Sequence, residues 1–297
     1  MSNLNQRKAA RKPDAQRYAH FNKNFCNYPM GRDVRHRCNV KRFTNSNRPY
    51  LDLPTGEVRF VFSLDSDPSL HRYPTGGEID LLAQLMAMAK IRGTRQLDFP
   101  SKQALLAELG LTGRDSNRKR LIAGLDYWAS VQIHHREWHV KAHRPKIEMR
   151  IKPPLHWRAM GKGIRTTISE EWMRINYEGG YFIDVHLPLP HHAAGQNLAL
   201  MMRAFKPNNY LDEFPRRSIA TVAPKLGLNS RNHIGRQLDI AVKHADVWYK
   251  RGNGYAFLYY RDGEIVAGTE DPKAEPRRRV KRPKTTLVPA MADEFEG

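Results

Sequence analysis

Two clusters of basic and amide side chains have the residue types and spacing that suit contact with the bases and phosphates of a nucleic acid. Arg can pair with a guanine edge, Asn and Gln with adenine, and Lys with a phosphate. Taken singly, each cluster is equally compatible with the solvated face of an amphipathic helix. The first cluster comprises Arg114, Ser116, Asn117, Arg118, Lys119 and Arg120, and the second, roughly 115 residues further on, comprises Arg231, Asn232, His233, Arg236 and Gln237.

The same short pattern precedes both clusters and indicates how each is positioned. Leu-Gly-Leu occurs at residues 109–111 and again at 226–228, where it can end one helix. Thr112 and Asn229 follow, and small polar residues of this kind cap the start of the next helix. The sequence therefore predicts a helix-turn-helix in each copy. The repetition favours nucleic-acid contact over the solvated-face interpretation.

The elements around the first cluster predict a domain with its own core. Alternation at residues 50–63 predicts a hairpin, and residues 78–90 predict a buried helix. Ser101 is expected to cap the helix that precedes the basic one. Apolar residues at helical spacing would attach the basic helix to this core, namely Leu121, Leu125 and Trp128.

Two alternating runs after the basic helix, at 131–139 and 147–151, predict a strand pair. Such a pair directly after a recognition helix would be a wing that follows the phosphate backbone. The expected backbone contacts at its tip are Lys141, Arg144 and Lys146. Gly161-Lys162-Gly163 resembles a phosphate-binding loop only superficially, since the first glycine and the hydroxyl of that motif are missing. Nucleotide hydrolysis is therefore not expected.

The second copy has the same order of elements. Residues 197–205 predict a buried helix, and residues 218–226 a shorter one with Pro224 near its end. The following basic helix has an inward stripe at Ile234, Leu238, Val242 and Ala245. Strands at 247–249 and 255–260 would then form a second wing. Its basic turn would carry Lys250 and Arg251.

The predicted fold class is α+β, with two tandem winged helix-turn-helix domains and flexible basic tails. Residues 1–49 are rich in Lys and Arg with few aliphatic side chains, and we expect a flexible arm. Residues 50–160 form the first winged-helix domain. Residues 161–262 form the second, with a connector that contains a helix capped by Ser169 and a strand. Residues 263–297 form a disordered basic and acidic tail.

Composition narrows the class of partner. A formal net charge of +20 favours a polyanion, because neutralising phosphates releases counterions. A membrane partner is less favoured, since no apolar run approaches about 18 residues. Without an apolar segment of signal-peptide type near Met1, and with only two cysteines in 297 residues, a reducing bacterial cytoplasm fits.

A metal site is the alternative use of the histidines and cysteines. Cys26, His36 and Cys38 could bind zinc with His20, but the spacing matches no standard pair of zinc knuckles. The histidines between 134 and 156 lack a carboxylate or Cys at a usual spacing. We therefore expect no metal and no cofactor.

Three segments make the chain similar to the theta-type plasmid replication initiators, the Rep proteins built from two winged helices. They are Tyr50 to Phe60, with its Leu-Asp-Leu-Pro-Thr-Gly-Glu sequence, Glu78 to Ala89, and Ile168 to Glu171. The likeness covers roughly residues 50–262 and is strongest to the broad-host-range branch that includes the IncQ-group iteron-binding initiators. It implies binding to double-stranded direct repeats at an origin, opening of adjacent DNA, and recruitment of host helicase, with the host initiator as a further partner. It also implies that both winged helices contact one repeat, and that a homodimer often represses transcription.

Two other functions remain open on the sequence. A transcriptional repressor could use the same two units, and the sequence does not separate it from an initiator. A rolling-circle nicking enzyme would hold a metal with a His-x-His triplet, and this triplet is absent from the chain. We therefore expect no enzymatic activity.

Overall fold

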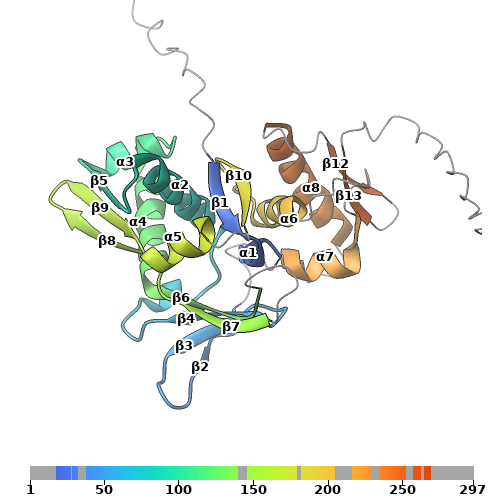
Figure 1. The fold of residues 1–297 in the computed structure, drawn as a ribbon, viewed down its shortest axis with the longest axis horizontal. Helices are drawn as coiled ribbons and strands as arrows, with labels where there is room; N and C mark the ends of the chain where they lie inside the picture. Colours follow the sequence, from blue (N-terminus) through green and yellow to red (C-terminus); the bar gives the residue numbers. More distant parts are fainter. Residues whose placement is uncertain are drawn as a thin grey trace, which may run out of the picture.

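The computed structural model describes residues 18–27, 29–32, 38–139, 146–178, 182–204, 216–228, 234–251, 257–261 and 264–268. Helices and strands are mixed along the chain, as expected for an α+β protein (Figure 1). Two groups of elements repeat the same order of helices and strands. Each group is a winged helix, so the predicted fold class is confirmed.

The first winged helix combines three helices with a small antiparallel sheet. Its elements are α2 (Gly76–Arg92), β5 (Gln96–Phe99), α3 (Lys102–Glu108), α4 (Asp115–Ser130), β8 (Leu155–Met160) and β9 (Gly163–Ile168). The strand order is β5-β9-β8. The hairpin of β8 and β9 is therefore the wing, because its strand β9 pairs with the strand that lies between the first two helices.

The second winged helix has the same topology. Its elements are α6 (Ala193–Ala204), β11 (Arg216–Ser218), α7 (Ile219–Leu226), α8 (Ile234–Arg251), β12 (Phe257–Arg261) and β13 (Glu264–Gly268). The strand order is β11-β13-β12, which corresponds strand for strand to the first sheet. Leu238, Ala241 and Ala245 of α8 are buried in the hydrophobic core, and Ile234 and Val242 pack against it, which agrees with the predicted inward stripe.

The helices that precede the two helix-turn-helix turns end in nearly the same way. The glycine of each Leu-Gly-Leu has a left-handed backbone, with φ of +72° at Gly110 and +76° at Gly227. The next backbone N–H, of Leu111 or Leu228, donates to the carbonyl five residues earlier at 2.8 and 3.0 Å. This is the geometry that ends a helix at a glycine. The predicted helix end at each Leu-Gly-Leu is therefore confirmed, whereas Asn229, the expected cap of the following helix, lies outside the described residues.

The strand pair expected to be the first wing belongs to another sheet. β6 (Val131–His139) and β7 (Lys146–Ile151) are inserted between α4 and β8. They extend a five-stranded antiparallel sheet whose order is β2-β3-β4-β6-β7, built with β2 (Lys41–Arg42), β3 (Pro49–Asp52) and β4 (Val58–Phe62). The wing assignment was wrong because β6, which pairs with β7 along one edge, pairs with β4 along the other. A wing strand would pair with β5 instead. A short 3-10 helix, η1 (Pro68–Leu70), follows β4.

Helix α2 is the centre of the first core. It is buried continuously from Glu78 to Ala89, as the buried helix predicted from the sequence requires. Leu121, Leu125 and Trp128 of α4 face this core and are at most 3% exposed. The indole Nε1 of Trp128 donates to the carbonyl of Glu78 at 2.7 Å, which fixes the end of α4 against the start of α2.

Part of the segment expected to be a flexible arm belongs to the core. β1 (Tyr18–Asn22) pairs with β10 (Phe182–His186), and α1 (Lys23–Asn27) follows it. Phe21, Phe25, Cys26 and Met30 are each at most 4% exposed. The expectation was wrong for this part because aromatic and sulfur side chains, rather than aliphatic ones, supply the apolar surface. Residues 1–17 lie outside the described residues.

The predicted second wing is misplaced by several residues. Residues 247–249 continue α8 as a helix, and so Lys250 and Arg251 are its last two residues rather than a turn. Val, Trp and Tyr favour a strand locally, but α8, which packs against α6, continues through them as a helix. The hairpin is formed by β12 and β13 instead, and its turn lies outside the described residues.

The expected boundary between residues 160 and 161 falls in the turn between β8 and β9, two strands that pair with each other. The connector then enters α5 (Glu170–Tyr177), whose predicted cap is confirmed, since the Ser169 hydroxyl accepts from the N–H of Trp172 at 3.2 Å. Within the described residues, no helix is both long and apolar enough to cross a bilayer.

Candidate nucleic-acid interface

Helix α4 presents the first basic cluster from its first two turns. Arg114 is the N-cap residue, with an extended backbone and no side-chain cap. Thr112 was expected in this position. It instead accepts two hydrogen bonds from Nδ2 of Asn117, at 2.9 Å to its carbonyl and 3.1 Å to its hydroxyl. Asn117 would have to give up these bonds before both of its amide atoms could read an adenine.

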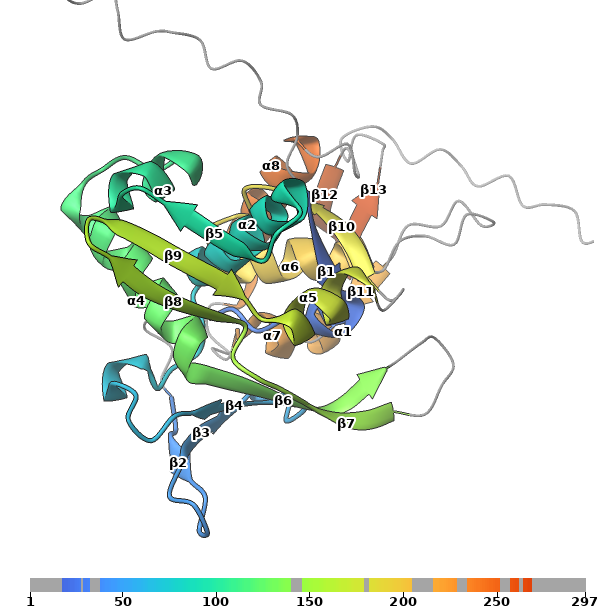
Figure 2. The ribbon, with the colours of Figure 1, turned by 60° about the vertical axis from the view of Figure 1, so that its left-hand side comes forward.

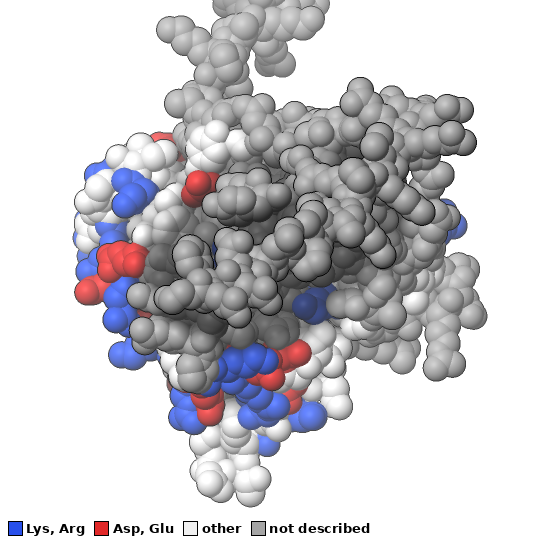
Figure 3. Space-filling view, turned by 45° about the vertical axis from the view of Figure 1, so that its right-hand side comes forward, with Lys and Arg blue, Asp and Glu red and all other residues white. Residues whose placement is uncertain are grey.

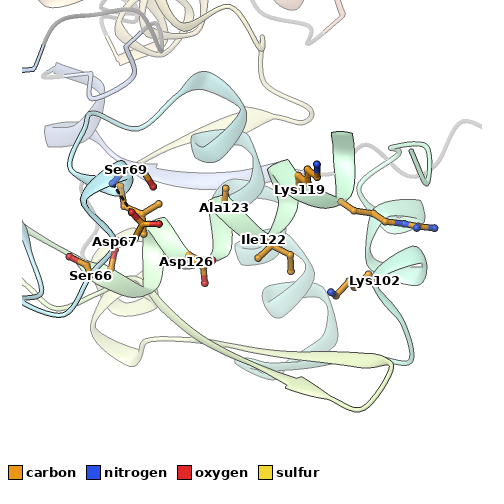
Figure 4. A pocket seen from close by; sticks show the side chains of 11 residues that line it. Ser66, Asp67, Ser69, Lys102, Lys119, Ile122, Ala123 and Asp126 are labelled. Carbon is orange, nitrogen blue, oxygen red and sulfur yellow. Dashed lines mark hydrogen bonds between the residues drawn. The ribbon is translucent and has the colours of Figure 1, made fainter. Parts of the chain in front are cut away.

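The exposed face of α4 changes charge along its length. Arg114, Arg118, Lys119 and Arg120 are exposed near its start, and Arg118 Nη1 lies 3.2 Å from Asp115 Oδ1. A groove runs along this face with Lys102 and Lys119 at one end and Asp67 and Asp126 at the other (Figure 4). Since carboxylates repel phosphates, the first turns of α4 suit contact with a nucleic acid better than its end does.

The wing of β8 and β9 lies beside this basic end. Figure 2 shows the turn between the two strands at the end of the unit where α4 begins. Nε1 of Trp157 on β8 donates to Oδ1 of Asp126 on α4 at 2.9 Å, which attaches the wing to the helix. Arg158 and Lys162 are exposed on the hairpin. The wing and α4 can therefore meet the same DNA molecule.

The shape of the wing depends on two glycines. Gly161 has a φ of +62°, as the first residue of a two-residue hairpin turn often has. A Cβ at Gly163 would lie 2.6 Å from the carbonyl oxygen of Phe99, so only glycine allows β9 to approach the end of β5 this closely. This wing was not predicted from the sequence, although Gly-Lys-Gly between two alternating runs is a hairpin signal.

The wing carries positive charge without a counterbalancing carboxylate of its own. Residues 155–168 include no Asp or Glu. Arg165 forms a two-point ion pair with Asp98 on β5, in which Nη2 lies 3.2 Å from Oδ2. This pairing holds the pKa of Asp98 below its usual range. Arg158 and Lys162 remain as the cations of the hairpin that are placed to meet a phosphate.

The other predicted contact residues are only partly located. Lys146 lies on β7 and pairs with Glu137 of β6, in the inserted sheet. In the second unit, Arg236 is exposed and Gln237 is half-buried on α8. Five of the predicted residues lie outside the described residues: Lys141, Arg144, Arg231, Asn232 and His233.

The inserted sheet has a neutralised outer face. Asp52 accepts from Arg59 at 2.7 Å and from Arg136 at 3.4 Å, and Lys41 lies 3.8 Å away. Arg59 also stacks over Tyr50, with 4.2 Å between its guanidinium carbon and the ring centre. Figure 3 shows positive and negative side chains mixed over the lower part of the molecule. This face therefore offers less free positive charge than its Arg and Lys content suggests.

Buried hydrogen bonds hold the second unit to the first. The carboxylate of Asp80, on α2, accepts from the backbone N–H of Leu189 in the connector at 2.7 Å. Nε2 of His191 lies 3.4 Å from the same carboxylate, which raises the pKa of the imidazole. Nε2 of Gln196, on α6, donates to the carbonyl of Gly76 at 2.8 Å. These bonds restrict how far the two units can move apart.

The N-terminal segment adds further bonds at this junction. Nδ2 of Asn197, on α6, donates to the carbonyl of Gly31 at 2.7 Å. The buried Arg32 side chain packs on the second helix-turn-helix turn, where a Cβ at Gly227 would lie 2.5 Å from its Cδ. Residues 29–32 and helix α1 therefore contact the second unit, while β1 contacts α2 of the first.

The two cysteines considered as metal ligands are thiols that are not in a disulfide. Burial raises the pKa of both Cys26 and Cys38. Among the described residues, no group of three or more His, Cys, Asp and Glu side chains is arranged to hold an ion. His36 and His143 lie outside them.

No family model matches the sequence, and no curated protein does. Among solved structures, one of selenomethionine derivatives of domains 2 and 3 of RctB aligns with a TM-score of 0.49 at 10% identity, covering 84% of this chain and 99% of that chain. Another structure of RctB domains 2 and 3 aligns with a TM-score of 0.42 at 8% identity, covering 82% and 94%. A fold likeness at such identities does not transfer a function, which has to be argued from the site.

Proposed function

We propose that this protein binds specific double-stranded DNA with both winged-helix units and initiates replication at an origin. The observation that carries the proposal is the pair of units with the same topology, each with a basic recognition helix and a wing. The basic first turns of α4 would read base edges in a major groove, and Arg158 and Lys162 would contact phosphates beside it. Arg236 of α8 is the described candidate for base contact in the second unit.

The junction between the units supports binding of both to one site. A linked second contact is intramolecular, so two weak contacts can act as one tight contact. The bonds of Asp80, Gln196 and Asn197 across the junction would favour this by limiting the relative motion of the units. If both recognition helices enter major grooves on one face, the grooves should be about 10 base pairs apart or a multiple of that.

The initiator role itself rests on the similarity of residues 50–262 to the plasmid Rep proteins, and it includes direct repeats as the target and host helicase as a partner. A location in the bacterial cytoplasm, dimer formation and the absence of nicking activity are part of the same proposal. A transcriptional repressor would share the DNA contacts. The two roles can be distinguished with a plasmid that carries only the gene for this protein and its neighbouring repeats. An initiator should allow this plasmid to replicate, whereas a repressor should not.

The first experiment is selection of bound duplexes from a random-sequence pool by the full chain. We expect a repeated site to emerge. Log affinity should fall with log salt with a slope of about −5 or steeper, as contact with six phosphates would give. Footprinting of the selected duplex should show two protected grooves. Equal affinity for a scrambled duplex would remove the basis for the proposal. A nicking assay with Mg²⁺ or Mn²⁺ should show no cleavage.

A further inference from the structure

The tip of the first wing presents a large apolar side chain to solvent. Met160 is the last residue of β8 and is 47% exposed. Its partner across the hairpin is Gly163, which has no side chain to cover it. The turn between them consists of Gly161 and Lys162. The tip is therefore narrow, and the thioether projects from it without a neighbour on the opposite strand.

Positive charge surrounds this apolar residue. Side chains two residues apart in a strand lie on the same face, so Met160 shares its face with exposed Arg158. Arg165 lies directly opposite Arg158 in the register of the two strands. The one carboxylate that contacts the hairpin from β5, Asp98, is already bound by Arg165. An apolar tip flanked by free cations suits a polyanion with an apolar interior.

We propose that Met160 enters the minor groove as a wedge between two base pairs, next to the major groove that α4 contacts. This inference rests on the proposed function, since it requires α4 and the wing to bind one duplex. Proteins that bind the minor groove insert apolar side chains, Met among them, between base steps and bend the DNA by about 20–90°. An unbranched thioether adapts to such a gap more readily than a branched side chain does.

The wedge gives the wing a second task besides contact with phosphates. Arg158 and Lys162 hold the hairpin against the backbone, and Met160 unstacks the step that it enters. Flexible pyrimidine–purine steps cost least to deform, so the wedge selects such a step at a position where the protein forms no hydrogen bond to a base. An initiator that unstacks one step within its own binding site lowers the cost of opening the DNA nearby.

The test uses the full chain and the duplex selected from the random pool, with 2-aminopurine placed at one position at a time along the site. Fluorescence of this base rises when it is unstacked. We expect a rise at one step beside the α4 contact with the unaltered protein. Met160→Ala should abolish the rise and lower the affinity about tenfold, which corresponds to about 1.4 kcal/mol. Met160→Leu should keep the rise, because the wedge remains apolar.

The matched control is Ile147→Ala, which removes an apolar side chain that is 44% exposed on the inserted sheet. It should change neither affinity nor fluorescence. The wedge is overturned if Met160→Ala gives the same rise in fluorescence as the unaltered protein. It is also overturned if the unaltered protein binds tightly but unstacks no base at any position. Either result leaves the proposed function intact. Failure of the full chain to select any duplex would overturn both.

Discussion

Replacing Arg158 and Lys162 together by Ala should lower both the affinity for DNA and its dependence on salt. Both side chains are exposed on the hairpin of β8 and β9, whereas Arg165 of the same hairpin is bound by Asp98. The double variant should therefore lose two phosphate contacts. Each contributes about 0.9 to the slope of log affinity against log salt, so the slope should become shallower by about 1.8.

The change can be measured by fluorescence anisotropy with the selected duplex at several salt concentrations. Raising the salt from about 50 to 200 mM should weaken DNA binding by both proteins. The fold-loss of affinity should be about twelve times smaller for the double variant than for the unaltered protein. Its thermal stability should change little, because exposed substitutions of this kind usually alter the free energy of unfolding by less than about 0.5 kcal/mol.

Lys146→Ala is the matched control, because Lys146 is also an exposed cation at the end of a hairpin. It lies on β7 and is paired with Glu137, in the sheet that is not the winged-helix sheet. We expect its salt slope to match that of the unaltered protein. The reasoning is refuted if Lys146→Ala flattens the slope more than the double variant does, since β6 and β7 would then be the strands that follow the backbone.

Three further predictions concern stability. Phe25→Ala should lower the free energy of unfolding in urea by about 3–5 kcal/mol, because its ring is buried; a loss below about 0.5 kcal/mol would place this segment outside the core. Gly227→Ala should cost more than Gly56→Ala in a thermal melt. Both glycines have positive φ, but only at Gly227 would a Cβ also clash with Arg32, and equal losses would rule out that clash. Burial lowers the pKa of His135 from 6.5 to about 4. Below about 6.5 the unfolded chain takes up the proton first, so stability should fall between pH 6.5 and 4, by up to about 1.4 kcal/mol per pH unit. His135→Leu should reduce this slope but not abolish it, because burial also lowers the pKa values of His20, His71 and His134. An unchanged slope would show that His135 does not contribute.

Several features were predictable because they depend on residues close together in the sequence. Each Leu-Gly-Leu turn is set by a glycine that can adopt positive φ and by apolar neighbours that pack on the helix it ends. The inward face of α4 follows from Leu121, Leu125 and Trp128 at helical spacing. The cap at Ser169 depends on one hydroxyl and an N–H three residues later.

The sequence alone determined the two helix-turn-helix units, their basic outer faces and the strong positive charge, because turns, caps and helical periodicity are local properties. Only the tertiary structure decided which hairpin is the wing. β6 and β8 both alternate, and the choice of β9 as the partner of β5 depends on hydrogen bonds and packing between distant segments. Likewise, Phe25 in a basic segment becomes a core residue only because the rings of Trp138 and Trp172 surround it. A local pattern specifies a strand or a helix, but the partner of each element is selected by long-range contacts that no short window of sequence contains.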